Sequence, residues 1–381
     1  MADMTPDCSR LQIDDVPRIG HIEEIMVNIL PRLPAKTAVK CKTVCKFWSR
    51  LISEPEFPTL HLKHSKNNPK CVLCPYSRET AAASHLYIME GNGEISQSIQ
   101  ISGIENIPSS DISCSSKGLF LSVEEDTHKM NMVHLRIFNP YTRDVLQLPL
   151  GTRSAALPCV GALITGNNEF KVFRFYGVSS HRNFSYKCEV FASGSTSWRT
   201  ISNYVEILSR HPWHQLCPRY ANVDESLYWF VNCLSNPGVP LCILSINQNE
   251  EVIEIRLPGR LSPINFLFEF EGCLAVLHVV HNFMHSDEPM HLEIFKYVND
   301  SWHLRSRVEF EPKPICQVNS VVAYKNEMFF IVRLEDNSLW YVIFNADKGT
   351  FTTLDHLSER FARFAPFAFP FVESLLKWSG A

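Results

Sequence analysis

The histidines and cysteines between residues 61 and 74 are spaced as metal ligands often are. His61, His64, Cys71 and Cys74 form an H-x₂-H-x₆-C-x₂-C pattern that superficially resembles a zinc set. Cys71 and Cys74 are three residues apart in an expected strand, however, so their side chains point to opposite faces of a sheet. We therefore expect no zinc site in this segment.

Other reactive side chains give no stronger indication of chemistry. His278, His281 and His285 would share a face of a helix, but the surrounding VLHVVHNF predicts a strand. Acidic pairs such as Glu250-Glu251 lie at expected turns, where solvated charges are more common than an acid/base couple. Nucleophile-elbow, phosphate-loop and zinc-protease motifs are all absent from the sequence. We expect no catalytic residue, no metal and no cofactor.

The composition is that of an ordinary globular protein. Of the 381 residues, 45% are hydrophobic and 20% are charged, and the net charge is −4, too small to predict that the whole chain binds nucleic acid or a membrane. The sequence shows no signal peptide and no apolar run of about 20 residues. The 13 cysteines are irregularly spaced and lie mostly in apolar runs, so we expect a reducing compartment, cytoplasmic and/or nuclear.

A strand–turn–strand pattern returns six times at a step of roughly 50 residues. Its aligned anchor positions are Ile88, Phe138, Phe191, Ile246, Phe295 and Phe344. A repeat of this period is typical of small sheets that must stack on their neighbours, as propeller blades do.

One repeat predicts a whole four-stranded unit, with antiparallel strands near 160–165, 169–177, 187–193 and 197–201. The first repeat lacks a strand before residue 70, and the apolar run 366–376 has no hairpin of its own. We expect that run to pair with the first repeat and close a ring, because closure removes exposed sheet edges.

Residues 22–52 show helical periodicity instead. Ile22, Ile25, Ile29 and Leu33 recur at steps of three and four, and further short helices are expected at 35–42 and 44–52. Three helices of about thirty residues cannot bury enough apolar area to be stable alone. Either the following domain or a partner must cover them.

Charge on these helices leaves three interpretations open. Residues 31–50 contain six basic side chains and no acidic one. This pattern fits a solvated basic face, an acidic protein partner or a nucleic acid, although no basic patch continues elsewhere in the chain.

The segment 22–57 resembles an F-box. The matching features are Ile29-Leu-x-Arg-Leu-Pro34, Val44-Cys-Lys-x-Trp48 and Leu51-Ile-Ser53 with a trailing Pro-Glu-Phe57. The resemblance implies docking on the Skp adaptor and, through it, on cullin. It further implies that the docking face and its support are formed by Ile22, Ile25, Ile29, Leu33, Val44, Trp48 and Leu51. His21-Ile22 stands where the family usually has Leu-Pro, so the fixed entry angle of the proline is lost.

The remaining three hundred residues resemble the F-box-associated domain of plant F-box proteins. The matching pieces occur in order along the chain: Asn139-Pro-x-Thr-Arg143, Phe170-Lys-Val172, Ser197-Trp-Arg199, Leu227-Tyr-Trp229 and Val372-Glu-Ser-Leu375. The resemblance implies a propeller-like fold and a role in capturing a protein target for ubiquitylation.

Long connections are expected on one face of the propeller. They would follow the second strand of a unit (124–133, 178–186, 233–240, 281–291) or its fourth strand (202–219, 258–265). Rigid scaffolds usually carry recognition on such loops. The candidate target-binding residues in them are His181, Arg182, Phe184, His211, Trp213, His214, His281, Phe283, Met284 and His285.

The sequence thus predicts an α+β chain of two modules, a small three-helix F-box-like domain followed by an all-β propeller of about six four-stranded units. The expected boundaries are a flexible N-terminus (1–18), the helical domain (19–57), a linker (58–69), the propeller (70–376) and a tail (377–381). The resemblance implies a non-catalytic substrate-recognition subunit of an SCF-type E3 ubiquitin ligase. The alternatives are a protein-binding scaffold with a degenerate F-box and, less well supported, a propeller enzyme with a polar central pocket.

Overall fold

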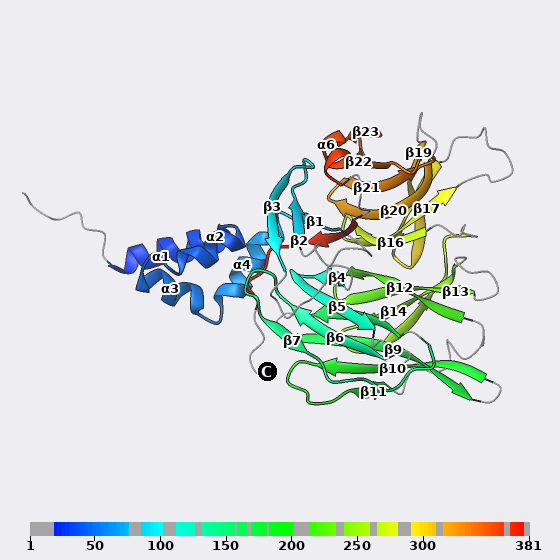
Figure 1. Cartoon of the computed structure of the whole chain (residues 1–381), viewed down its shortest axis with the longest axis horizontal. Helices are drawn as coiled ribbons and strands as arrows, with labels where there is room; N and C mark the ends of the chain where they lie inside the picture. Colours follow the sequence, from blue (N-terminus) through cyan, green and yellow to red (C-terminus); the bar gives the residue numbers. More distant parts are fainter. Residues whose placement is uncertain are drawn as a thin grey trace, which may run out of the picture.

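The computed structural model in Figure 1 joins a group of helices to a ring of sheets. It describes residues 19–75, 85–101, 112–125, 132–156, 158–165, 169–180, 183–201, 214–233, 240–259, 265–280, 291–309, 315–361 and 366–376. Within these ranges no helix has the length and hydropathy needed to span a membrane.

The helical module comprises the elements at the N-terminal end of the described chain. They are α1 (Ile19–Ile29), the 3₁₀ turn η1 (Leu30–Arg32), α2 (Ala35–Cys41), α3 (Lys46–Ser53) and α4 (Phe57–Ser65). Pro31 and Pro34 separate α1 from α2, as expected of residues that cannot continue a helix. Cys45 precedes α3 in extended conformation, and its Sγ accepts a hydrogen bond from the Trp48 amide at 3.4 Å.

Helix α4 occupies most of the segment 58–69, which was expected to be a linker. Phe57 and Leu62 bury their side chains at 5% and 9% exposure. Leu62 packs with the propeller core and Phe57 with the helical core. The sequence signal for this helix was weak because Pro55 and Pro58 lie near its start, a position that tolerates proline.

Six four-stranded antiparallel sheets form the propeller, and we number them as blades 1 to 6. Blade 1 consists of β24 (Phe367–Phe371), β1 (Lys70–Cys74), β2 (His85–Met89) and β3 (Ile95–Gln100). Blade 2 consists of β4 (Ile112–Ser116), β5 (Leu119–Glu125), β6 (Val133–Phe138) and β7 (Val145–Gln147). Blade 3 consists of β8 (Cys159–Ile164), β9 (Phe170–Ser180), β10 (Asn183–Ala192) and β11 (Arg199–Ile201). Blade 4 consists of β12 (His214–Val223), β13 (Ser226–Cys233), β14 (Pro240–Asn247) and β15 (Val252–Ile255); blade 5 of β16 (Asn265–Phe270), β17 (Cys273–Val280), β18 (His291–Val298) and β19 (Ser301–Glu309); blade 6 of β20 (Ile315–Tyr324), β21 (Glu327–Leu334), β22 (Leu339–Asn345) and β23 (Thr350–Thr353), after which comes α6 (Asp355–Arg360).

The ring closes through the C-terminal strand, which confirms the prediction made for residues 366–376. Strand β24 pairs antiparallel with β1 over Lys70↔Phe371 to Cys74↔Phe367 and becomes the first strand of blade 1. The first strands of the six blades contact one another in a complete circle, β24–β4–β8–β12–β16–β20–β24, around the central channel. The six-unit prediction is therefore confirmed.

The repeat anchors occupy equivalent places in the blades. Ile88, Phe138, Phe191, Ile246, Phe295 and Phe344 lie in β2, β6, β10, β14, β18 and β22, the third strand of each blade. The periodicity found in the sequence is therefore the step from one blade to the next.

Apolar clusters lie between the blades rather than within them. Among the described residues, each pair of neighbouring blades shares one cluster, as blades 5 and 6 do with Phe268, Phe270, Met328 and Phe330. Each sheet buries its two faces against its two neighbours, which explains why a single repeat could not fold alone.

Cys71 and Cys74 contribute to two different clusters, between blades 6 and 1 and between blades 1 and 2. The two thiols therefore point to opposite sides of blade 1, as their spacing predicted. Burial raises the pKa of both thiols.

Candidate functional site

The C-terminal residues Val372–Leu376 run between the helical module and the propeller. Leu375 packs into the helical core with Leu30, Ala38 and Leu51, whereas Leu376 packs into the core between blades 2 and 3. The Asn139 side-chain amide holds this segment by donating to the carbonyls of Ser374 and Leu376, both at 3.0 Å. One short stretch of chain thus connects the two modules, and we call it the junction segment.

The turn between β4 and β5 leaves room for the junction segment only because it contains glycine. Gly118 has a φ of +81°, and a Cβ placed there would lie 2.3 Å from the Val372 carbonyl oxygen and 2.4 Å from the Ser374 Cβ. A side chain at this position would push the segment away from the propeller.

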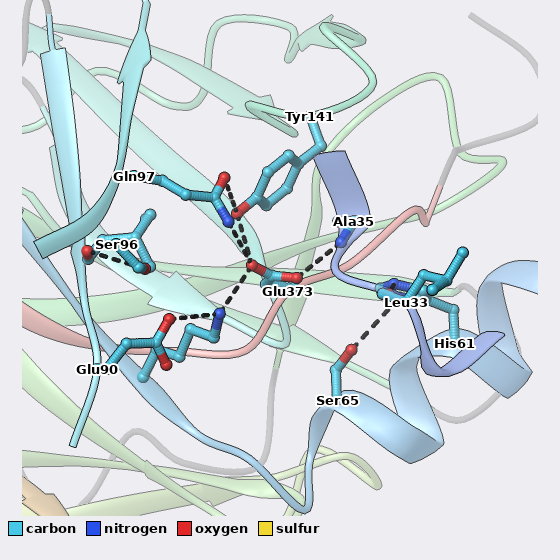
Figure 2. Close-up of polar contacts among 11 residues, drawn as sticks. Leu33, Ala35, His61, Ser65, Glu90, Ser96, Gln97, Tyr141 and Glu373 are labelled. Carbon is cyan, nitrogen blue, oxygen red and sulfur yellow. Dashed lines mark hydrogen bonds and ion pairs between the residues drawn. The ribbon is translucent and has the colours of Figure 1, made fainter. Parts of the chain in front are cut away.

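Glu373 is the polar centre of the junction, as Figure 2 shows. Its Oε2 accepts the backbone amide of Ala35, the first residue of α2, at 2.7 Å. Its Oε1 accepts from Lys70 Nζ at 3.1 Å, Gln97 Nε2 at 3.1 Å and the Tyr141 hydroxyl at 3.0 Å. Glu373 is 4% exposed. The four donors therefore supply the hydrogen bonds that water would give to an exposed carboxylate. Glu373 thus ties α2 to blades 1 and 2.

Lys70 is the cation that lies between two carboxylates at this site. Lys70 is also paired with Glu90 at 2.8 Å. Burial opposes the charged form of Lys70, but hydrogen bonds and attraction from Glu90 and Glu373 outweigh it and raise the pKa of the ammonium group. Burial, together with the neighbouring Glu373 charge, raises the pKa of Tyr141, which stays a donor at neutral pH.

His61 forms a second connection, within the helical module. The ring is fully buried, with Nε2 3.0 Å from the Leu33 carbonyl oxygen and Nδ1 3.4 Å from the Ser65 hydroxyl. Burial lowers the pKa of this imidazole despite the opposing effect of the Leu33 carbonyl. His61 is therefore a neutral core residue that links α4 to the loop before α2.

Several apolar side chains of the helical module remain exposed. Val44 is 62% exposed, Ile25 is 50% exposed and Ile29 is 46% exposed. Ile25 and Ile29 are four residues apart on α1 and share a face of that helix. Val44 lies in the turn between α2 and α3, because the helix expected at 44–52 begins only at Lys46. We call Ile25, Ile29 and Val44, all in the helical module, the exposed helical residues.

The other residues predicted for this face have different environments. Leu33 and Trp48 are half-buried against the helical core, and Leu51, at 3% exposure, belongs to that core. Ile22 lies in α1, but its side chain is outside the described part of the structure. Leu51 can support the face but does not lie on it, a distinction that helical periodicity could not make.

Basic side chains accompany the exposed helical residues. Arg32, Lys36, Lys40, Lys46 and Arg50 are exposed and Lys42 is half-buried. Arg50 is paired with Glu23 at 3.0 Å. The surface is therefore apolar and positively charged, which suits an acidic protein partner.

The helical module lies on the propeller face that carries the tight turns. The β4–β5 turn at Gly118 and the β6–β7 turn at Asn139 both contact the junction segment. In an up-and-down blade the other two kinds of connection lie on the opposite face. The strand ends that border the predicted target-binding loops are therefore on the face of the ring away from the helices.

The structure describes the side chain of none of the ten candidate target-binding residues. The structure gives the backbone, but not the side chain, of Phe184 in β10 and of His214 in β12. Neither backbone nor side chain is described for His181, Arg182, His211, Trp213, His281, Phe283, Met284 and His285.

Two of the predicted long loops are wrong in length. Strands β9 and β10 continue pairing as far as Ser180↔Asn183, so 178–186 is the end of a long hairpin. Strand β12 begins at His214, which shortens the predicted loop 202–219. Cross-strand pairing extended both elements beyond their apolar runs.

Sequence reasoning missed the roles of Glu373, Lys70, Gln97 and Tyr141. The available signal was an acidic residue inside the apolar run Val372–Leu376, because a charge in such a run must find partners when it is buried. Its partners lie as much as 338 residues away in the chain, so no local pattern identifies them.

Comparison with known proteins gives one family match and several relatives. Residues 78–265 match the family described as "F-box associated beta propeller domain". "F-box protein At5g49610" of Arabidopsis thaliana is 26% identical over 361 residues, which cover 86% of this chain and 92% of that protein. "F-box protein CPR1" of Arabidopsis thaliana is 24% identical over 293 residues, covering 67% of this chain and 65% of that protein, just under two thirds of its length.

A solved structure titled "Structure of YjhT" aligns with 71% of this chain and 91% of its own, at 10% identity and a TM-score of 0.40. This likeness is too slight to support an inference about fold or function.

Proposed function

From its resemblance to plant F-box proteins with an F-box-associated domain, which these comparisons confirm, we propose that this chain is the substrate-recognition subunit of an SCF-type E3 ubiquitin ligase. In this proposal α1, α2 and α3 are the F-box and dock on the Skp adaptor, which connects the chain to cullin. The propeller holds the protein target. The chain carries no catalytic residue and accelerates ubiquitin transfer by positioning the target.

The observation that carries the proposal is the contrast between covered and exposed apolar residues in the helical module. Leu375 and Tyr141 of the same chain pack with its core. Ile25, Ile29 and Val44 stay exposed in a segment that also carries exposed basic residues. Large apolar side chains grouped on a short helical module are a typical protein-binding surface.

The proposal assigns different roles to the predicted adaptor-binding residues. Ile25, Ile29 and Val44 contact the adaptor, together with Ile22 of the same helix. Leu33, Trp48 and Leu51 hold these helices in the docking arrangement, because they are half-buried or buried in the helical core.

We further propose that residues 19–57 form the F-box and residues 70–376 the substrate-binding propeller. Helix α4 then serves as the rigid connection between them, since its residues pack into the cores of both. Target capture is assigned to the loop face, which lies opposite the helices. A cytoplasmic or nuclear location fits this role.

Binding of the purified full-length chain to a plant Skp adaptor, measured by isothermal titration calorimetry, tests the proposal. Ile25→Glu and Val44→Glu place a charge on the proposed face without changing a buried residue. Each should weaken binding at least about tenfold, equivalent to about 1.4 kcal/mol. Ile253→Glu is the matched control, because Ile253 is also an exposed apolar residue, 55% exposed, but belongs to blade 4.

Circular dichroism should show unchanged helix content for all three variants. If the wild-type chain does not bind the adaptor, the ligase proposal is wrong and the alternative, a protein-binding scaffold with a degenerate F-box, takes its place. If Ile253→Glu weakens binding as much as Ile25→Glu, the docking surface is not on the helices.

A further inference from the structure

The central channel of the propeller contains a cavity that the proposed ligase role does not use. Its volume is about 150 Å³, and its walls come from the first strands of four blades, β12, β16, β20 and β24, with Phe230 of β13. The junction segment and the exposed helical residues take no part in it.

The walls of the cavity are mainly apolar, and several of its side chains are only half-buried. They include three phenylalanines, Phe266, Phe367 and Phe369, together with Val321 and Ala323. The alternate side chains of these strands, such as Val322 and Ala368, are buried between blades. Phe266, Val321 and Ala323 pack partly against the cluster between blades 5 and 6, and Phe369 against the one between blades 1 and 2. As half-buried residues they keep some apolar surface uncovered, which an apolar ligand could bury.

The polar residues in the lining are Tyr220, Asn222, Asn265, Glu269 and Ser320. Ser320 is 5% exposed, and its Oγ accepts the backbone amide of Ala368 at 3.3 Å. Its hydroxyl hydrogen can still donate to an acceptor, because a serine hydroxyl is both donor and acceptor. Glu269 also borders the cavity, but it is exposed and its carboxylate accepts the Gly272 amide of the β16–β17 turn at 3.1 Å.

Two of the strands that form the cavity are irregular where its lining begins. The pairing of β20 with β21 shifts register between Val318 and Ser320, and that of β12 with β13 shifts between Leu216 and Tyr220. Such bulges redirect side chains and are common beside binding sites. Ser320 and Tyr220 are both lining residues that immediately follow a shift.

We propose that this cavity binds a neutral, compact aromatic molecule of one or two fused rings that carries a hydrogen-bonding group. A cavity of about 150 Å³ lined by apolar side chains is large enough for benzene, and phenylalanine rings favour an aromatic ligand through offset or edge-to-face packing. Ser320 supplies the hydrogen bond that orients it. The site is independent of adaptor docking and is a property of the propeller itself.

Saturation-transfer NMR and calorimetry on the full-length chain, with indole, phenol, toluene and benzoate as probes, test this proposal. Indole and phenol should bind, and benzoate should bind at least about tenfold more weakly than phenol, since its carboxylate would lose water among the apolar side chains of the cavity. Ala323→Leu should abolish binding by filling the cavity. Thr350→Leu, a similar enlargement at an exposed position of β23, should leave binding unchanged.

Ser320→Ala provides a second test that does not depend on filling the channel. It should reduce the affinity for phenol relative to toluene, because only phenol uses the hydroxyl group. Near-UV circular dichroism checks that each variant is folded. If Ala323→Leu does not fold, Val321→Phe serves as the variant that fills the cavity. Absence of indole and phenol binding to the wild-type chain, or equal binding by the filled variant, would overturn the proposal. Neither result would bear on the Skp-binding measurement.

Discussion

Glu373 illustrates how one buried charge can fix the relation between two modules. Its carboxylate accepts hydrogen bonds from α2, β1, β3 and the β6–β7 turn. A buried carboxylate is costly unless its donors are all in place, so the site is satisfied only when the helices and both blades have their observed arrangement. An apolar residue at this position would need no hydrogen-bond donors, so it would not require the helices and blades to take this one arrangement.

At Gly118 the structure predicts an effect that depends on contact rather than on backbone strain alone. Gly118→Ala should reduce the free energy of unfolding by about 2 kcal/mol more than Gly194→Ala. Both glycines have similar φ values, +81° and +79°, but only Gly118 faces the junction segment, whereas a Cβ added at Gly194 would meet no atom within 4 Å.

Urea denaturation of the two glycine variants checks this expectation. The shared conformational cost of a side chain at positive φ cancels in the comparison. Equal destabilisation of the two variants would show that the close contact with Val372 and Ser374 has no energetic consequence.

The buried His61 imidazole predicts a pH dependence of stability. Burial lowers its pKa in the folded chain below the ordinary value of 6.5, so the unfolded chain binds a proton that the folded chain does not. The free energy of unfolding should therefore be insensitive to this group above pH 6.5 and decrease as the pH falls below that value.

Denaturation midpoints at several pH values, compared with those of His61→Gln, measure this contribution. The variant should lose part of the decrease below pH 6.5. His278, whose pKa is also lowered by burial, accounts for some of the dependence that remains. A variant with an unchanged pH profile would contradict the assignment.

Among the elements, β24 has the largest consequence for the fold. It is the last strand in the sequence and the first strand of blade 1, so the ring is joined by hydrogen bonds between β24 and β1 rather than by a chain connection. Phe371, at its end, stacks on Phe120 of blade 2 with ring centroids 5.6 Å apart. Closure thus combines pairing within blade 1 with packing onto blade 2.

Phe371→Ala should destabilise the propeller by about 3 kcal/mol or more, because the lost ring leaves a cavity at the closure. Pro370→Ala, in the same strand but exposed, should change stability by less than about 1 kcal/mol. Thermal unfolding followed by tryptophan fluorescence measures both, and similar stabilities would indicate that closure does not depend on this contact.

Neighbouring blades are also joined by a recurring polar contact. Trp198 of blade 3 donates its indole N–H to the Pro149 carbonyl after blade 2 at 2.8 Å, and Trp302 of blade 5 donates to the Arg256 carbonyl after blade 4 at 2.7 Å. Both tryptophans precede or begin the fourth strand of their blade. The same element of the repeat therefore supplies a directional contact at two different interfaces.

At the scale of the whole molecule, the proposed function requires the helices and the loop face to have a fixed relation. The junction segment joins the helices to blades 1 and 2, and the proposal assigns target capture to the opposite face of the ring. A target held by the loops would then be presented in a constant direction relative to the adaptor, which is the contribution that positioning requires.

Loosening the junction should therefore separate docking from ubiquitin transfer. Glu373→Ala leaves the exposed helical residues unchanged and leaves Lys70 paired with Glu90. It removes the acceptor of the Ala35 amide and of Tyr141, with an expected loss of about 3 kcal/mol of stability. The variant should bind the Skp adaptor within about threefold of wild type but transfer ubiquitin more slowly to a target or to the chain itself. Glu335→Ala, at an exposed turn, is the control.

A reconstituted ligase assay at saturating adaptor concentration distinguishes these effects, with hydrogen exchange of α2 amides reporting the loosened junction. Wild-type transfer rates in Glu373→Ala, despite faster exchange in α2, would show that the relation between the modules need not be fixed.

The sequence by itself determined the repeat, the blade count and the helical character of residues 22–52. These features follow from the alternation and spacing of apolar residues, as the placement of all six anchors in third strands shows. Even ring closure could be inferred, because a short first unit and an unpaired last strand complement each other. Such signals are local, and each segment carries its own.

Only the tertiary structure decided which apolar helical residues are exposed and which belong to the core. Ile25 and Leu51 fit the same helical periodicity, yet one is 50% exposed and the other 3%, because Leu375, from the far end of the chain, packs into the helical core. The same holds for Glu373, the Gly118 contact and the channel cavity. Each depends on surfaces from distant segments meeting, and the packing of those surfaces is a property of the assembled ring rather than of any one stretch of sequence.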